Sequence, residues 1–220
     1  MPEQATVPRT RRRDKLAPDP GVRREILAAA SATLKENGIR GFSIAAVLDR
    51  AALGTRAFYR HFDSKDELVA AVFLESARTE TRRLRRRMSA ATTEIAAVAA
   101  WIDARLDLAF DDNIRSDLRR LSLEAQTQSL GSPSLVQPAY VELLKPLREV
   151  LQRGMQRGVF RGTDPATDAQ FIHGVVWAAI DRHWTTADSA RGDIRERILG
   201  FCLRALDVAP EAIAQISTDN

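Results

Sequence analysis

The chain has 220 residues, of which 45% are hydrophobic, and it carries a formal net charge of +4 at pH 7. This length suits one small and one larger domain, and the hydrophobic content excludes a chain that is disordered throughout. Apolar runs such as 175–180 are far too short to span a membrane, and no apolar signal region follows the basic N-terminus.

A basic segment without apolar periodicity opens the chain. Its cations are Arg9, Arg11, Arg12, Arg13 and Lys15. Residues 1–18 are therefore expected to form a flexible arm, which either tracks phosphates and a minor groove or only keeps the protein soluble. Asp19 and Pro20 then form the N-cap and the first residue of a helix that Gly38 ends.

Two short helical patterns separated by a tight turn follow, in the segment 42–68. Ser43 can cap the first helix, whose apolar residues recur at helical spacing. Gly54 is expected to supply the turn, and residues 55–62 form the second helix, with two phenylalanines directed inward and basic and aromatic side chains outside. This arrangement predicts a helix-turn-helix motif, whose second helix fits the major groove of DNA.

The same segment resembles the DNA-binding signature of the TetR family of bacterial transcriptional regulators. It matches that signature at Ser43 (for Thr), Ile44, Val47, Ala51, Leu53 (for Val), Tyr59, Phe62, Lys65, Glu67 and Leu68. It departs at Leu48 (for Ala), Ala52 (for Gly), Gly54 (for Ser) and Arg56 (for Gly). The close match covers residues 20–75, and it implies a helical C-terminal domain that binds a ligand and forms a homodimer.

Seven side chains are predicted to contact double-stranded DNA, by resemblance at the motif positions and by exposure at the others. They are Ser43, Thr55, Arg56, Tyr59, Arg60, His61 and Lys65. Residues 1–65 hold 13 Lys and Arg against 7 Asp and Glu, a net charge of +6, whereas the remaining residues hold 20 against 22, a net charge of −2. The positive excess thus lies on the part that carries the motif, as phosphate binding requires.

A long helix is predicted to connect the motif to the rest of the chain. Ser64 and Glu67 form a capping box at its start, and no breaker interrupts residues 65–87, a length of about 33 Å. We expect this helix to act as a lever between two domains. Its last arginines are interpreted as a solvated turn with no contact to DNA: Arg82, Arg83, Arg85, Arg86 and Arg87.

Five more helices are predicted after residue 90. Their expected spans are 92–110, 114–130, 138–158, 165–186 and 192–208, with a loop at 131–134. The predicted fold is therefore all-α, with nine helices and no strand pattern. The expected domains are a basic arm (1–18), a helix-turn-helix domain (19–66), a helical ligand-binding and dimerisation domain (67–210) and a tail (211–220).

The last two helices are expected to form a homodimer interface, although two adjacent apolar helices can also be ordinary core. The resemblance favours an interface, because the family dimerises through a four-helix bundle made from its last two helices. The expected centre of that interface is Trp177, Ile180, Trp184, Ile198 and Phe201. A two-fold dimer would place two recognition helices on a palindromic operator.

Large apolar side chains of the second domain are expected to line a cavity for a small hydrophobic molecule. The apolar candidates are Phe73, Ala77, Trp101, Leu108, Leu121, Tyr140 and Phe171. Polar groups to orient the molecule are Arg105, Glu124, Gln128 and His173. Most of the apolar candidates are expected to be plain core. A ligand among these helices would shift the 65–87 helix and release the operator.

Catalysis is not indicated by any pattern in the sequence. His61, His173 and His183 lack the spacing of metal ligands, and the single cysteine, Cys202, suits a reducing cytoplasm. We therefore expect no enzyme activity, no cofactor, no metal and no membrane partner. Three classes stay open: a ligand-responsive regulator, a DNA-binding protein without an effector, and, least favoured, a helical enzyme with an incidental helix-turn-helix.

Overall fold

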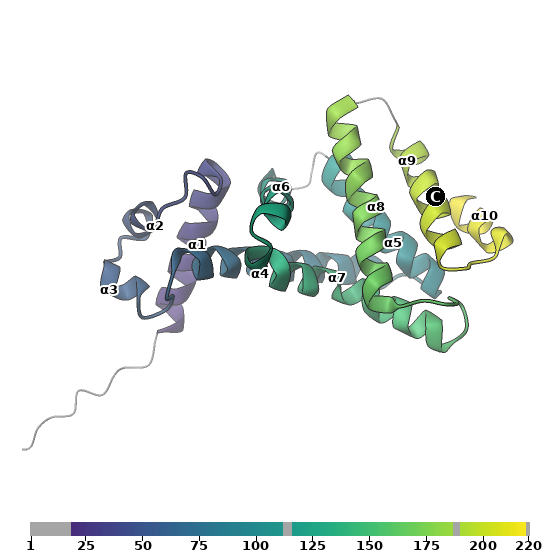
Figure 1. The fold of residues 1–220 in the computed structure, drawn as a ribbon, viewed down its shortest axis with the longest axis horizontal. Helices are drawn as coiled ribbons and strands as arrows, with labels where there is room; N and C mark the ends of the chain where they lie inside the picture. The colour runs from purple at the N-terminus through teal and green to yellow at the C-terminus, as the bar shows by residue number, and fades with distance from the viewer. Residues whose placement is uncertain (1–18, 112–115, 187–189, 219–220) are drawn as a thin grey trace, which may run out of the picture.

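The structure of the protein, a computed structural model, describes residues 19–111, 116–186 and 190–218. Ten helices and no strand occur in these residues, which confirms the all-α fold class (Figure 1). The predicted arm, residues 1–18, lies outside the described residues. The additional helix is α10 (Pro210–Thr218), which occupies most of the segment expected to be a tail.

The N-terminal unit consists of α1 (Pro20–Asn37), α2 (Ile44–Ala51) and α3 (Thr55–Phe58). Its helix starts are capped as the sequence predicts. The carboxylate of Asp19 accepts a hydrogen bond from Gly21 N at 2.7 Å, and Ser43 Oγ accepts one from Ala46 N at 3.1 Å. Gly38 ends α1 with a positive φ of 61°, and its N–H donates to Leu34 O.

The turn between α2 and α3 differs from the prediction. Ala52, not Gly54, takes the left-handed conformation, with φ 52° and ψ 40°. The N–H of Leu53 reaches back to Leu48 O at 3.0 Å, which is the bond that closes a helix C-terminus of this type. Gly54 is extended and serves as the N-cap of α3. Beyond the regular helix, bonds from the N–H groups of His61 and Phe62 to Phe58 O continue the turn.

Helix α4 (Lys65–Met88) has the predicted N-cap, because Glu67 N donates to Ser64 Oγ at 3.1 Å. The return bond differs from a capping box, since the Glu67 carboxylate accepts from Asp63 N at 2.6 Å and not from Ser64 N. It leaves the N-terminal unit and runs beside α7 (Pro133–Gln156) along the long axis of the molecule (Figure 1). Its last turns are not simply solvated, contrary to our interpretation. Arg83 and Arg87 pair with Asp107, while Arg85 pairs with Glu149.

The remaining helices are α5 (Glu94–Phe110), α6 (Ser116–Gly131), α8 (Pro165–Thr186) and α9 (Arg191–Ala205). Helix α7 begins at Pro133 instead of Pro138, so the expected loop shrinks to Ser132. Proline is well placed at a first helical position because its missing N–H has no partner there, and Pro133 takes that position. Pro138 is tolerated inside the helix, where it is exposed. No helix among the described residues is long and apolar enough to cross a bilayer.

Two clusters of buried apolar side chains hold the fold together. The N-terminal core joins α1, α2, α3 and the first half of α4, and it also includes Leu121 of α6 and Val136 and Ala139 of α7. The C-terminal core joins the end of α4 with α5, α7, α8 and α9. The N-terminal core therefore extends past residue 66, where we placed the domain boundary. Tyr140 packs against both cores.

Candidate functional site

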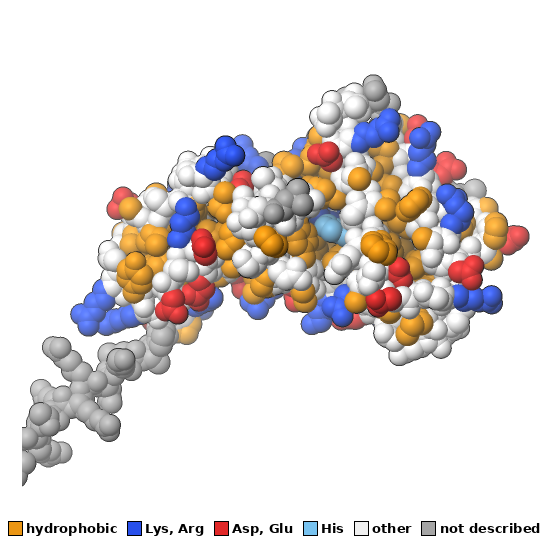
Figure 2. All heavy atoms as spheres, viewed as in Figure 1, with side chains coloured by type: hydrophobic (Ala, Val, Ile, Leu, Met, Phe, Trp, Pro, Cys, Tyr) orange, Lys and Arg blue, Asp and Glu red, His pale blue; other side chains and the backbone are white. Residues whose placement is uncertain are grey.

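Helix α3 presents an exposed polar and aromatic surface at the outer end of the N-terminal unit. Phe58 and Phe62 are buried and fix the segment to the core. Tyr59 is 60% exposed and rests edge-on against Phe58, with ring centroids 5.0 Å apart. Arg56 and Arg60 are exposed beside it, and Lys and Arg side chains mark this end of the molecule (Figure 2). The surface can therefore offer two guanidinium groups and one phenol to a partner.

All seven predicted DNA contacts lie on or next to this surface. Thr55 is exposed at the first residue of α3, and Ser43 is exposed but already caps α2. His61 is half-buried. Lys65 is half-buried, with its Nζ 5.7 Å from the centroid of the Phe42 ring. The geometry thus brings the seven residues together around the helix-turn-helix.

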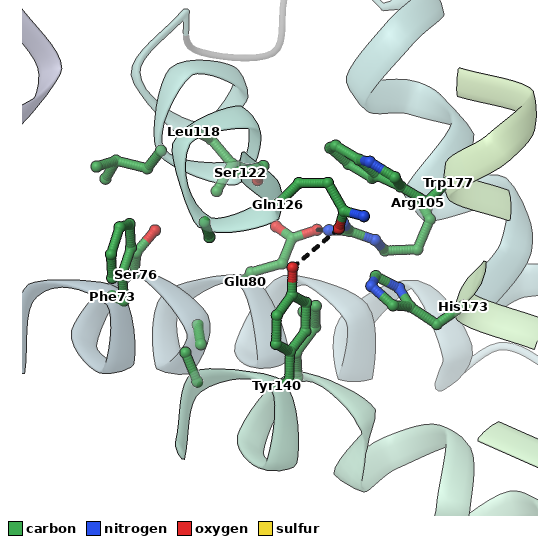
Figure 3. Close-up of a pocket in the computed structure, with 15 residues that line it drawn as sticks. Phe73, Ser76, Glu80, Arg105, Leu118, Ser122, Gln126, Tyr140, His173 and Trp177 are labelled. Carbon is green, nitrogen blue, oxygen red and sulfur yellow. Dashed lines mark hydrogen bonds and ion pairs between the residues drawn. The ribbon is translucent and has the colours of Figure 1, made fainter. Parts of the chain in front are cut away.

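A second candidate site is a cavity of about 50 Å³ lined by α4, α5, α6, α7 and α8 (Figure 3). Its lining is Phe73, Ser76, Ala77, Glu80, Arg105, Leu118, Leu121, Ser122, Ala125, Gln126, Ala139, Tyr140, Leu143, His173 and Trp177. Four of these residues belong to the N-terminal core, whereas Leu143 and Trp177 belong to the C-terminal core. The cavity therefore lies where the two cores meet.

One end of the cavity is apolar and the other is polar. Phe73 and Leu118 lie at the apolar end, while Arg105 and His173 lie at the opposite end (Figure 3). Arg105 donates to Glu80 at 3.1 Å, and both side chains are only 3% exposed. Arg83 binds the same carboxylate through two hydrogen bonds of 2.9 Å.

The buried carboxylate and guanidinium remain ionised. Burial alone would raise the pKa of Glu80, but the hydrogen bond from Arg83 and the nearby positive charges bring it below its usual value. Burial lowers the pKa of Arg105, yet a guanidinium starts so high that it keeps its proton. The pair therefore supplies fixed charges of opposite sign at the polar end of the cavity.

Several polar atoms at this end have no hydrogen-bond partner among the described residues. They are Nδ1 and Nε2 of His173, Nε of Arg105 and, in the adjoining core, Nε1 of Trp101. Burial, together with the charge of Arg105, lowers the pKa of His173 to about 3. The imidazole is therefore neutral, with one nitrogen that donates and one that accepts.

An outer hollow of about 280 Å³ adjoins the cavity and shares Gln126, Tyr140 and His173 with it. Tyr140 Oη donates to Gln126 Oε1 at 2.9 Å, across the boundary between the two spaces (Figure 3). A histidine side chain is visible in a hollow between α6 and α8 (Figure 2). The Tyr140–Gln126 pair therefore lies between the cavity and the outer hollow.

Six of the predicted ligand-binding residues line the cavity: Phe73, Ala77, Arg105, Leu121, Tyr140 and His173. The other predicted ligand-binding residues do not line the cavity. Trp101 and Leu108 are fully buried core, and Phe171 is 65% exposed. Gln128 donates to Glu124, which in turn accepts from Ile39 N. Sequence reasoning missed Ser76, Glu80, Leu118, Ser122 and Gln126, although helical spacing from Phe73 and Leu121 could have found the first three.

The five residues predicted for a dimer interface occupy different environments. Ile180 is 0% exposed, and Trp177 and Ile198 are also buried in the core of their own chain. Trp184 is half-buried against Trp177. Only Phe201 is exposed. A helical stripe of apolar residues did not reveal which side of α8 and α9 faces the chain's own core.

Metal and thiol chemistry find no support in the described residues. No group of three His, Cys, Asp or Glu side chains there could hold a metal ion. Cys202 is buried, and burial raises the pKa of its thiol to about 12. A thiol with so high a pKa is a packing residue.

The described residues thus form a helical protein with a helix-turn-helix unit at one end and a cavity where its two cores meet. Residues 26–72 match the family model of bacterial regulatory proteins, tetR family. The resemblance seen in the sequence is thus confirmed for the N-terminal unit, which is similar to the DNA-binding region of the TetR family. No curated protein sequence matches the chain significantly.

Solved structures share the fold along most of the chain. RolR in complex with resorcinol is 20% identical, with a TM-score of 0.66 over 91% of this chain and 94% of RolR. FadR from Bacillus subtilis in complex with stearoyl-CoA is 19% identical, with a TM-score of 0.60 over 83% and 96% of the two chains. A Mesorhizobium loti protein assigned to the TetR family is 19% identical, with a TM-score of 0.62 over 84% and 96%. At these identities the likeness shows the fold alone.

Proposed function

We propose that the protein is a ligand-responsive repressor. As a homodimer in the cytoplasm it would bind a palindromic operator in double-stranded DNA, and a small hydrophobic effector would release it. No cofactor and no catalytic step are part of this proposal.

The observation that carries the proposal is the course of α4. This helix starts at Lys65 beside the helix-turn-helix, and its middle turns supply Phe73, Ala77 and Glu80 to the wall of the cavity. A molecule that fills the cavity must therefore press on the element that leaves the DNA-binding unit. A coupling free energy of only about 1–3 kcal/mol changes operator affinity roughly 5- to 150-fold.

Two further observations support the proposed small-molecule effector and the proposed homodimer. RolR and FadR, which share the fold, were solved with resorcinol and stearoyl-CoA, so this architecture accommodates small molecules with large apolar parts. Phe171 of α8 and Phe201 of α9 are 65% and 58% exposed. Exposed aromatic side chains on the last long helices are suitable anchors for a second copy of the chain.

The DNA contacts are tested on an operator selected from random DNA by the purified protein. Replacing Tyr59 and Arg60 together by alanine should weaken binding by at least about 30-fold, since each lost base contact costs about 1–3 kcal/mol. Affinity of the unchanged protein should fall steeply with added salt. Arg182, exposed on α8, provides the control, because its replacement should leave affinity unchanged. Salt-independent binding would contradict the proposal.

The effector response is tested by filling the cavity from α4. Ala77→Trp places a large ring in the lining and should either mimic the ligand or abolish the response. Because Ala77 also belongs to the N-terminal core, thermal melting checks that the DNA-binding unit of this variant is folded. Operator affinity is measured with and without candidate apolar compounds.

A DNA-binding protein without an effector is the alternative, and the small cavity of about 50 Å³ favours it, since ligand sites usually measure about 300–1,000 Å³. Unchanged operator affinity in Ala77→Trp and with every compound would select this alternative.

A further inference from the structure

The polar end of the cavity contains more hydrogen-bonding capacity than the chain itself uses. Both ring nitrogens of His173 and the Nε of Arg105 are buried without a partner. Leaving such a group unpaired costs about 1–3 kcal/mol, so unpaired buried groups in native proteins call for an explanation. In Figure 3 these side chains converge with Tyr140 and Gln126 at one end of the cavity. The convergence indicates a place for a polar group from outside.

The unpaired atoms define the chemistry of that group. Arg105 Nε–H needs an acceptor, and the unprotonated nitrogen of neutral His173 needs a donor. A single hydroxyl satisfies both, because its oxygen accepts while its proton is donated. A methyl group satisfies neither.

Ionised groups fit this place poorly. The carboxylate of Glu80 already pairs with Arg105 at 3.1 Å, so a second carboxylate would meet a negative charge in a buried setting. A carboxylate also has no proton for the acceptor nitrogen of His173. A ligand cation would meet Arg105. The charges at the polar end thus select for a neutral ligand.

The side chains that line the cavity indicate the shape of the apolar part of the ligand. Phe73, Tyr140 and Trp177 line it with aromatic rings, and Ala77, Ala125 and Ala139 leave space between them. Aromatic side chains pack well against a flat ring, in offset or edge-to-face contact. The apolar end, near Phe73 and Leu118, lies opposite the polar end (Figure 3). An elongated molecule with one polar end matches this layout.

We propose that the cavity binds a neutral, phenol-like compound whose hydroxyl lies between Arg105 Nε and His173 and whose apolar part points toward Phe73. This assignment rests on the proposed effector function and names the chemical class of the effector. The outer hollow of about 280 Å³, which shares Gln126, Tyr140 and His173 with the cavity, adjoins its polar end and offers a route of access.

The test compares three compounds of one shape, 4-ethylphenol, 4-ethyltoluene and 4-ethylbenzoate, by titration calorimetry on the full chain without DNA. The phenol should bind at least about tenfold more tightly than the other two, since one satisfied hydrogen-bond site is worth that much. His173→Phe keeps a flat ring but removes both nitrogens, so the preference for the hydroxyl should disappear. His173→Gln offers both a donor and an acceptor and should restore part of it.

A matched control is His183, whose Nδ1 is also buried without a partner but which stacks on Phe110 away from the cavity, with centroids 4.0 Å apart. His183→Phe should leave the preference unchanged, and thermal melting checks the fold of each variant. Equal affinity for phenol and toluene, or tighter binding of the benzoate, would overturn the assignment while leaving DNA binding untouched. Tight binding of the phenol without operator release would support the assignment and instead refute the effector role.

Discussion

The N-terminal unit and the second domain satisfy their polar groups in different ways. In the N-terminal unit, Asp19, Ser43 and Ser64 cap helices within a few residues of themselves. In the second domain, Glu80 of α4 pairs with Arg105 of α5, and Asp103 of α5 pairs with Arg195 of α9. Among the described residues, every buried side-chain nitrogen or oxygen that lacks a hydrogen-bond partner lies on α5 or α8. The N-terminal unit therefore satisfies its helix ends locally, whereas the second domain relies on pairs between helices and leaves several buried polar atoms unpaired.

The largest expected effect comes from breaking a long-range pair. Glu80→Ala leaves Arg105 buried without its carboxylate and should lower the free energy of unfolding by about 3–5 kcal/mol. Glu149→Ala removes a pair on the surface with Arg85 and should cost less than about 1 kcal/mol. Urea denaturation at pH 7 measures both.

A volume-matched double replacement sharpens this test. Glu80→Leu combined with Arg105→Met replaces the ion pair by apolar contacts and should recover most of the lost stability. If Glu80→Ala lowers the free energy of unfolding by less than about 1 kcal/mol, the buried pair contributes no more to stability than an ion pair on the surface.

The distance along the sequence between interacting residues explains which features could be predicted from the sequence and which could not. The caps and the lever helix were predictable because each signal lies within four residues of its partner. Glu80 and Arg105 are 25 residues apart, and no local pattern ties them together. The cavity was predicted only in part for the same reason. Its wall is assembled from five helices, and periodicity finds an apolar face without telling which neighbour it meets.

The next effect concerns pH and the unpaired imidazole. His173 has a pKa of about 3 in the folded chain against 6.5 ordinarily, because it is buried and faces Arg105, with Tyr140 and Glu80 around the same cavity. Below pH 6.5 the unfolded chain takes up a proton that the folded chain does not, so stability falls as pH falls toward 3. Between pH 7 and pH 5 the loss should be about 2 kcal/mol.

His173→Phe removes the contribution of this imidazole to the pH dependence of stability. The variant therefore reports the pH dependence that all other titrating groups cause. Urea denaturation at pH 7 and pH 5 should therefore show a smaller pH dependence in the variant. The same pH dependence in both proteins would mean that the imidazole is solvated like a surface histidine.

A smaller effect tests the contact between the two regions. Glu124 of α6 accepts from the backbone N–H of Ile39 at 3.2 Å, just after α1 ends. Glu124→Ala removes this acceptor and should weaken the change in operator affinity caused by 4-ethylphenol, by about 2- to 30-fold, as expected for a residue between two coupled sites. Glu75→Ala is the control because Glu75 pairs with Arg78 on its own helix. Equal effects of both changes would exclude α6 as a link.

The smallest expected effect lies in the N-terminal unit. Ala52→Gly relieves the left-handed backbone at φ 52° and should stabilise the protein by about 0.5–1 kcal/mol. Ala45→Gly, exposed inside α2, should instead destabilise it by about the same amount. Thermal unfolding separates the two, with a shift of about 2–4 °C per kcal/mol at this size. A destabilised Ala52→Gly would show that the turn is held by contacts of the methyl group.

Tryptophan is confined to one of the two regions. The three tryptophans of the sequence, Trp101, Trp177 and Trp184, are all carried by α5 and α8. Trp177 lines the cavity and meets Trp184 edge-on, with centroids 5.9 Å apart. Indole fluorescence therefore reports on the second domain alone. A change in emission when operator DNA is added must therefore be transmitted through the chain from the DNA-binding end. The fluorescence thus gives a signal for any coupling between the two regions without an added label.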